Sequence, residues 1–315
     1  MIPASACIAA YNEEKTIKIP LEYLTSLSQT LVDEILVCAN ACEDDTEKVV
    51  QSWSRTDKRV KLLTDDRPGK PNAWNTLVQN AKYNTLFFLD ADIAPQQWAL
   101  ENIINAFDDN IITVGGRARA TDFSGSLSSK CAAFMYGGTN QLHLAGSIYA
   151  TRKDRLLEKM DSYDFKEMPS NIFAEDGWLY MIHSPGEFKV ANNAVIHYNV
   201  GSLAVVIKQR ARERIAEDEL RENYPELSHN KLAIDDQIAK HDSLVNRFSQ
   251  FFNQETWRLA IEKTMRYLGM RLFFKLTEGK VDKIYETLKE EYDQQGGAYI
   301  LRSSARIPAS KNLTT

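Results

Sequence analysis

Short apolar runs alternate with helical patterns through the first half of the chain, and this alternation constrains the fold more than any other sequence feature. Each run is four or five residues long and most are rich in β-branched or aromatic side chains, as strands buried in a sheet are. The runs are Ala6–Ala10, Glu34–Cys38, Val60–Leu63, Leu86–Leu89 and Ile111–Val114. Alternating strands and helices predict an α/β fold with a mostly parallel sheet covered by helices.

Two stretches between these runs space their apolar residues as helices do. They carry Ile17, Leu21, Leu24 and Leu27, and then Trp74, Leu77, Val78 and Ala81. Pro20 has to lie near the first turn of its helix, and Pro71 is well placed at a helix start, because proline cannot donate a backbone hydrogen bond.

Polar and charged segments follow four consecutive predicted strands. These segments are Tyr11–Glu14, Asn40–Thr46, Asp65–Lys70 and Asp90–Asp92. Because ligands bind at the carboxyl ends of the strands in a doubly wound sheet, these segments predict a binding site at one edge.

Asp90-Ala91-Asp92 follows a fully apolar strand, which places two carboxylates at the margin of the core. Carboxylates this close repel each other unless a cation offsets their charge. One carboxylate together with substrate phosphates is a typical way of holding Mg²⁺ or Mn²⁺, so we expect a metal site here. The alternative is that Asp92 caps the next helix.

Lys70 lies beside Arg67 and Gly69 at a predicted helix start. A cation next to a helix N-terminus suits a diphosphate, although a solvated basic turn is the alternative. The glycine and Lys-Ser/Thr pattern of a phosphate-binding P-loop is missing.

A second acidic pair, Glu175-Asp176, lies between an apolar run and Trp178. Partial burial would raise the pKa of such a carboxyl group and make it a general base, so both acids are catalytic candidates. The alternative is an acidic first helical turn that favours the helix dipole. Further along the chain, His197 ends a predicted strand, and Gln209 and Arg212 share one helix face where they could hold an anionic leaving group.

Composition narrows the remaining possibilities. The formal net charge of −5 gives no sign of a nucleic-acid partner. Four cysteines in 315 residues fit a reducing compartment, and neither a secretory leader nor a run of about 20 apolar residues is visible. We therefore expect a cytoplasmic protein. From about Gly201 the sequence becomes helical and charged, so we predict a catalytic domain over residues 1–205, a helical region over 206–315, and a mobile tail or lid from 294.

The ordered set of strand-end segments, with Glu175-Asp176, Gln209 and Arg212, resembles the family-2 glycosyltransferases of the GT-A fold, from about Pro3 to Glu213. The resemblance implies an inverting transfer of one sugar from a nucleotide-diphosphate sugar, most commonly a UDP-sugar, with Mn²⁺ or Mg²⁺. It also implies roles by position. Nucleotide-sugar contacts would come from Ala10, Tyr11, Asn12, Glu13, Asn40, Arg67, Lys70, Asp90 and Ala91. Asp92 and His197 would hold the metal, Asp176 with Glu175 would be catalytic, and Trp178, Gln209 and Arg212 would contact the acceptor or leaving group.

Three departures from the family pattern matter. Asn40 stands where an acid is common, which leaves the nucleotide preference open, and Ala10 replaces a usual proline. Glu213 follows Arg212 where processive members carry tryptophan, which favours single transfer over polymer synthesis. The acceptor, whether a glycan, a lipid-linked or a small molecule, is not specified.

Three other interpretations remain. A sugar-nucleotide pyrophosphorylase would carry a glycine-rich loop after the first strand, where this chain has Tyr11–Glu14. A catalytically degenerate binding or scaffold protein would not need to keep the acidic pairs. Basic residues interleaved with Trp257, Leu268 and Phe273 suggest peripheral contact with an anionic membrane, although packing of this helix over the acceptor site is favoured.

Overall fold

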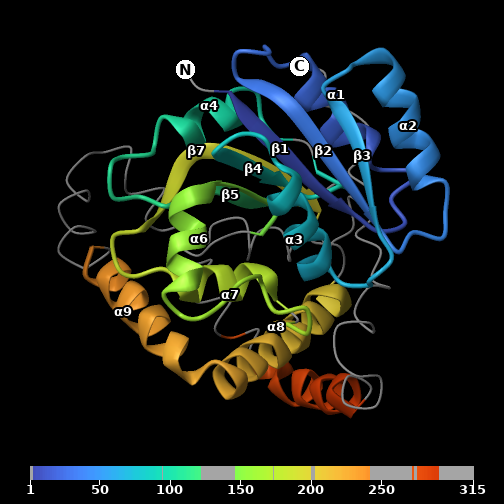
Figure 1. Ribbon diagram of the computed structural model, residues 1–315. Coiled ribbons are helices and arrows are strands. Elements are labelled where there is room, and N and C mark those ends of the chain that lie inside the picture. The colour runs from blue at the N-terminus through green and yellow to red at the C-terminus, as the bar shows by residue number, and fades with distance from the viewer. Residues whose placement is uncertain are drawn as a thin grey trace, which may run out of the picture.

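The computed structural model describes residues 3–93, 95–121, 146–172, 174–199, 203–241, 272 and 275–290. Within these residues, seven strands form one sheet in the order β3-β2-β1-β4-β6-β5-β7 (Figure 1). The strands are β1 (Ala4–Ala10), β2 (Val32–Asn40), β3 (Val60–Asp65), β4 (Thr85–Leu89), β5 (Thr113–Thr121), β6 (Ile148–Arg152) and β7 (Phe188–Asn199).

The first four strands form the parallel half of the sheet. β1 pairs in parallel with β2 and with β4, and β2 pairs in parallel with β3. Their carboxyl ends therefore lie at one edge, as the polar segments after the strands predict. β6 is antiparallel to both β4 and β5, whereas β5 and β7 are parallel. The predicted α/β architecture is confirmed, with β6 as the antiparallel exception.

The fifth strand differs from its sequence prediction. Ile111 and Ile112 precede it: the Ile111 amide bonds the Asp108 carbonyl, closing a turn. β5 then continues to Thr121 because its second half pairs with Val195–Asn199 of β7. A partner far along the chain thus extends a strand that local hydrophobicity ends at Val114.

Helices cover both faces of the sheet. α1 (Lys18–Ser26), α2 (Thr46–Thr56) and α4 (Ala99–Ile104) contribute to one hydrophobic cluster. α3 (Lys70–Asn80), α6 (Lys153–Asp161) and α7 (Glu175–Ile182) contribute to the other. Pro20 lies in the first turn of α1 and Pro71 in that of α3, as expected.

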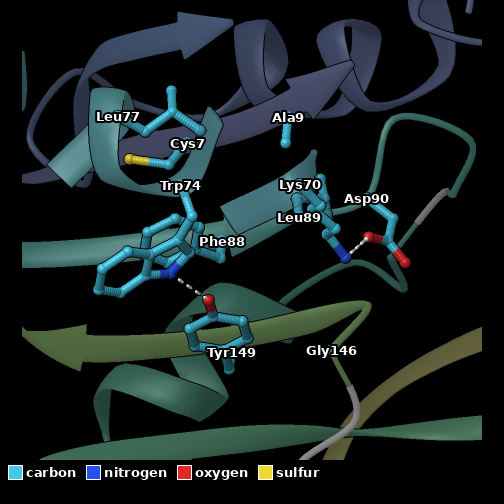
Figure 2. A pocket seen from close by; sticks show the side chains of 10 residues that line it. All are labelled: Cys7, Ala9, Lys70, Trp74, Leu77, Phe88, Leu89, Asp90, Gly146 and Tyr149. Carbon is cyan, nitrogen blue, oxygen red and sulfur yellow. Dashed lines mark hydrogen bonds and ion pairs between the residues drawn. The ribbon is translucent and has the colours of Figure 1, made fainter. Parts of the chain in front are cut away.

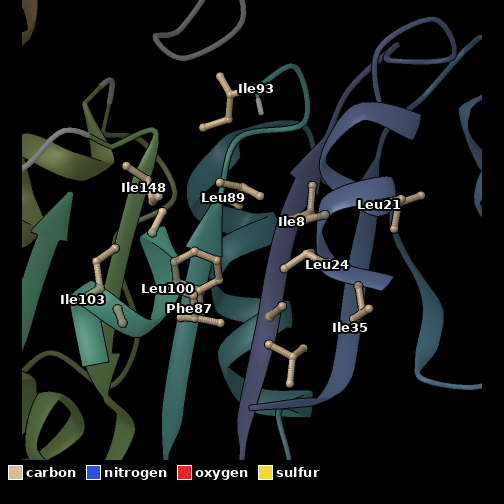
Figure 3. Close-up of a cluster of buried hydrophobic side chains, with 14 of the residues drawn as sticks. Ile8, Leu21, Leu24, Ile35, Phe87, Leu89, Ile93, Leu100, Ile103 and Ile148 are labelled. Atoms are coloured by element: carbon tan, nitrogen blue, oxygen red, sulfur yellow. The ribbon is translucent and has the colours of Figure 1, made fainter. Parts of the chain in front are cut away.

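Strand β1 shows why the run Ala6–Ala10 is apolar at every position. Ile8 belongs to the first cluster, which Figure 3 shows with Leu24 and Phe87, while the next residue back, Cys7, belongs to the second. Successive side chains of a strand point to opposite faces, so a strand covered on both sides needs a continuous apolar run. Full burial of a side chain as large as that of Ile8 stabilises the fold by about 1.5–3 kcal/mol.

The C-terminal helices share the second cluster. α8 (Leu203–Asn223) contributes Leu220, and α9 (Pro225–His241) contributes Leu227 and Ile234 to the core that also holds Trp178 of α7. The hydrophobic core thus crosses the boundary predicted at residue 205. Residues 275–290 are helical, and Val281 and Leu288 pack against α8.

Two further sequence predictions lie outside the described residues, namely the tail from 294 and most of the basic amphipathic stretch over 257–275. Among the helices that the structure describes, none combines the length and the apolar character that crossing a bilayer requires.

His183 connects α7 to the sheet in a fully buried position. Its Nδ1 lies 2.6 Å from the Leu179 carbonyl oxygen and its Nε2 lies 2.9 Å from Thr113 Oγ1. Because Nδ1 faces an acceptor, the neutral ring carries its proton there and accepts from the threonine hydroxyl at Nε2. Burial lowers the pKa of His183 to about 4, from an ordinary value of 6.5.

This shift predicts a loss of stability in mild acid. Above pH 6.5 His183 is neutral in both states, but between pH 6.5 and 4 the unfolded chain binds a proton that the folded chain excludes. The free energy of unfolding should fall by about 3 kcal/mol over that interval from this residue alone. Urea denaturation at pH 7, 5.5 and 4 measures it. His183→Gln should show a shallower pH dependence than the wild type. The exposed His229→Gln should not, and an unchanged slope in His183→Gln would contradict the assignment.

Candidate functional site

The loops that follow β1 and β2 are joined into one unit by hydrogen bonds. Asn12 Oδ1 accepts from the Glu43 amide at 2.8 Å, and the Glu13 amide donates to Thr46 Oγ1 at 2.7 Å. Asn12 and Ala41 hold positive φ angles of 54° and 49°. Backbone conformations of this kind persist only where surrounding contacts impose them, and they collect at functional sites. The half-buried Tyr11 and the buried Ala10 therefore sit on a fixed framework.

Asn40 holds the loop that follows β3. Its Nδ2 donates to the carbonyls of Asp65 and Arg67 at 3.2 and 2.6 Å, and its Oδ1 accepts from the Gly69 amide at 2.9 Å. Gly69 has a φ of 128°, which suits glycine before the first turn of α3. Asn40 is buried, and through these hydrogen bonds its side chain holds the loop after β3 in place.

Asp65 and Arg67 form an ion pair at the end of β3, with Arg67 Nη2 2.8 Å from Asp65 Oδ2. Hydrogen bonds from Arg67, and one from the Thr76 hydroxyl at 2.7 Å, overcome the opposing effect of burial and hold the pKa of Asp65 at about 2. The exposed Arg67 guanidinium, predicted to contact the nucleotide, is thus partly engaged by Asp65. No local sequence pattern indicates that Asp65 is its partner.

Lys70 lies between two carboxylates that come from different elements. At the first residue of α3, its ammonium lies 2.8 Å from Asp90 Oδ1 at the end of β4 and also pairs with Glu175, the first residue of α7. Figure 2 shows the ammonium pointing toward Asp90. Burial acts to lower the pKa of Lys70, but the two carboxylates hold it well above its ordinary value.

Glu175, rather than Asp176, is the more buried member of the second acidic pair. Its side chain is 11% exposed, and burial raises its pKa while the neighbouring Lys70 opposes that rise. The sequence alone suggested desolvation of this pair without distinguishing its members. The structure assigns the burial to Glu175 and joins it to the cation.

A small cavity of about 10 Å³ lies beside Lys70 and Asp90, large enough for about one water molecule. Aromatic side chains line it: Trp74 Nε1 donates to the Tyr149 hydroxyl at 2.8 Å, and the Phe88 ring stacks against both of these rings (Figure 2). These residues were missed in the sequence analysis because helical and strand spacing identifies them only as core.

Asp176 is fixed by two backbone amides. Its Oδ1 accepts from the Gly177 amide at 2.8 Å, and its Oδ2 accepts from the Gly146 amide at 3.2 Å. A Cβ at Gly146 would lie 2.7 Å from Asp176 Oδ2, so only glycine allows this approach. The sequence marks Gly146 as a turn residue, and nothing local links it to a carboxylate thirty positions later.

Asp92 is half-buried in the turn after β4. It does not cap a helix: α4 begins at Ala99, with Trp98 as its N-cap residue. The capping alternative is therefore wrong. His197 lies in β7 and pairs in register with Arg119, while its side chain falls outside the described part of the structure. Among the residues that are described, no group of three His, Cys, Asp or Glu side chains could hold a metal.

Trp178 requires a correction. It was predicted to contact the acceptor or leaving group, but its side chain is 0% exposed and packs edge-on against Phe165 at 5.2 Å between ring centroids. A side chain without accessible surface cannot contact a ligand in this conformation. Gln209 is exposed on α8 and donates to Glu213 at 3.3 Å, and Arg212 is half-buried on the same helix. Their predicted leaving-group contact stays a prediction.

The chain is similar to known proteins in sequence and in structure. Residues 5–149 match the family described as Glycosyl transferase family 2. Glycosyltransferase AglD of Haloferax volcanii is 28% identical over 108 residues, which cover 33% of this chain and 17% of that protein. Glucosyl-3-phosphoglycerate synthase of Mycobacterium tuberculosis is 33% identical over 93 residues, which cover 28% of each. The matches thus span less than a third of either relative.

A solved structure, the mannosyltransferase PcManGT from Pyrobaculum calidifontis in complex with GDP-Man and Mn²⁺, superposes with a TM-score of 0.54. It is 18% identical, and the match covers 85% of both chains. At this identity the likeness concerns the fold alone. It confirms the GT-A architecture that the sequence predicts.

The hydrogen bonds of Asn40 predict the effect of replacing it with the acid that family-2 glycosyltransferases commonly carry at this position. In Asn40→Asp, a carboxylate oxygen would replace the amide nitrogen that donates to two carbonyls, so buried acceptors would face one another. The free energy of unfolding should fall by about 2 kcal/mol, measured by urea denaturation. Asp66→Asn, at an exposed position of the same loop, should change it by less than about 0.5 kcal/mol. A stable Asn40→Asp variant would show that the loop does not depend on this amide.

Proposed function

We propose that the protein transfers one sugar from a nucleotide-diphosphate sugar to an acceptor, with inversion at the anomeric carbon, because residues 5–149 match glycosyltransferase family 2. The observation that carries the proposal is the meeting of Lys70, Asp90 and Glu175 at the edge where the parallel strands end, with Asp176 next in sequence. Ligands of doubly wound sheets bind at this edge.

The donor would lie against the joined loops after β1 and β2. Tyr11, Asn12 and Glu13 would contact the base and ribose, and Lys70 would face the diphosphate. A lysine ammonium at a helix N-terminus supports this placement, because backbone amides and the cation both favour an anion there. We propose a UDP-sugar first. The mannosyltransferase of the same fold was solved with GDP-Man, so a GDP-sugar is the direct competitor.

A divalent cation fits the acidic edge. The described residues offer single carboxylates rather than a group of three ligands, which suits a cation that takes further ligands from the diphosphate. Asp92 would hold it, with His197 as a second ligand. When bound, Mn²⁺ or Mg²⁺ supplies positive charge against the charge that grows on the leaving diphosphate.

Asp176 would act as the base. Its carboxylate is oriented by the backbone amides of Gly146 and Gly177. It would accept the proton of the acceptor hydroxyl as the acceptor oxygen attacks the anomeric carbon from the face opposite the diphosphate. Attack from that face inverts the anomeric centre. Lys70 would stabilise the departing diphosphate through its ammonium.

Calorimetric titration tests the donor class. UDP, GDP, CDP and dTDP are each titrated with MnCl₂ and again with EDTA. Either UDP or GDP should bind at least about tenfold more tightly with Mn²⁺ than with EDTA. The reason is that the cation offsets the repulsion between the diphosphate and the carboxylates at this edge of the sheet. Absence of binding by all four under both conditions would favour a catalytically degenerate scaffold instead.

Replacing the base separates binding from chemistry. Asp176→Asn keeps the size of the side chain and one of the two amide contacts, because only its oxygen can accept a hydrogen bond. It cannot take up the proton of the acceptor, so sugar transfer should fall by roughly 10²–10⁴-fold while nucleotide affinity stays unchanged. Release of nucleoside diphosphate from the nucleotide sugar is the measurement. Asp161→Asn, at an exposed position of α6, is the matched control and should retain full turnover. Unchanged turnover in Asp176→Asn would refute this role.

A further inference from the structure

Lys70 belongs to two parts of the site at once. It stands where a donor diphosphate would bind, yet it is also tied to Glu175, the residue next to the proposed base. We infer that Glu175 is a positioning residue that couples the donor site to Asp176 through Lys70. This inference rests on the function proposed above, and it assigns Glu175 a task other than proton transfer.

The three contacting groups come from three separate elements. Lys70 opens α3, Asp90 follows β4 and Glu175 opens α7. Lys70 is 41% exposed at its side chain, whereas Asp90 and Glu175 are 14% and 11% exposed. The carboxylates are thus held in the wall and the cation lies at the surface between them. Of the three side chains, that of Lys70 is the most accessible to an anion from solvent.

Glu175 also fixes how α7 is rotated. Consecutive residues of a helix point about 100° apart, so holding one side chain defines the direction of the next. With Glu175 held against Lys70, Asp176 is directed to Gly146, whose amide lies 3.2 Å from its Oδ2. The backbone of Gly146 packs so closely against Asp176 that a Cβ at position 146 would lie 2.8 Å from the Asp176 Cβ. This close packing leaves little room for another arrangement. A small rotation of α7 would therefore displace the carboxylate of Asp176.

The charge balance predicts an effect that a purely structural residue would not show. One ammonium now serves two carboxylates. Without the charge of Glu175, Lys70 would attract a diphosphate more strongly, because one competing anion is gone. At the same time α7 would lose the ion pair that orients Asp176. Nucleotide affinity and turnover should therefore change in opposite directions.

The test is Glu175→Gln, which keeps the size of the side chain and removes its charge. By calorimetry with MnCl₂, the Kd for whichever of UDP or GDP the wild type binds should fall roughly threefold, as expected for a partly exposed ion pair. The kcat for release of that nucleoside diphosphate from its sugar donor should fall roughly 10²-fold, because a misplaced catalytic group costs about that much.

Glu187→Gln is the matched control. Glu187 pairs with Lys159 at 2.9 Å in the loop after α7, so this variant removes a lysine–glutamate pair that does not involve Lys70. Its nucleotide Kd and kcat should match the wild type. Weaker nucleotide binding together with slower turnover in Glu175→Gln, or no change in either, would overturn the inference.

A double-variant comparison covers the case in which Glu175→Gln does not fold. Lys70→Met and Lys70→Met/Glu175→Gln should turn over at similar rates, because Glu175 acts on turnover through Lys70. A further tenfold loss in the double variant would show an independent role and overturn the inference. If the wild type itself neither binds a nucleotide nor releases one from a sugar donor, the proposed function fails first, so the two failures are distinguishable.

Discussion

Strand β1 pairs in parallel with β2 on one side and with β4 on the other, and its side chains enter the hydrophobic clusters on both faces. Because β1 is central and covered on both faces, the strands that pair with it in parallel end at the same edge of the sheet as β1 does. The loops after β1 and β2 then meet closely enough to exchange hydrogen bonds, and Asp90 emerges beside Lys70. The site is thus a consequence of parallel pairing around one buried strand, since parallel strands end at the same edge.

Charge is the second constraint on this edge. Asp90 and Glu175 share one cation, Lys70, and two further carboxylates, Asp92 and Asp176, lie next to them in the sequence. Carboxylates gathered in this way require compensation, and the proposed divalent cation would supply it when the donor binds. The two neighbouring carboxylates hold the pKa of Lys70 well above its ordinary value, whereas burial is the main reason why the pKa of Glu175 is raised.

Much of the fold could be predicted because local signals reported it. Apolar runs located the first four strands, and Pro20 and Pro71 marked helix starts. The strand-end segments also named Lys70 and Asp90, which the structure brings within 2.8 Å. Prediction failed where a residue's task depends on a distant partner. Trp178 was predicted to contact the acceptor or leaving group but is 0% exposed and packs against Phe165. The hydrogen bonds by which Asn40 holds the loop after β3 could not be predicted either.

The sequence by itself determined the α/β alternation, the polar strand ends and the resemblance to glycosyltransferase family 2, because hydrophobic period and residue type act over a few positions. Tertiary structure alone decided which acid joins Lys70, which glycine admits the Asp176 carboxylate, and how far β5 extends. Each of these depends on two segments far apart in the chain. Sheet order and helix packing set the distance between such segments, and no local pattern encodes that distance.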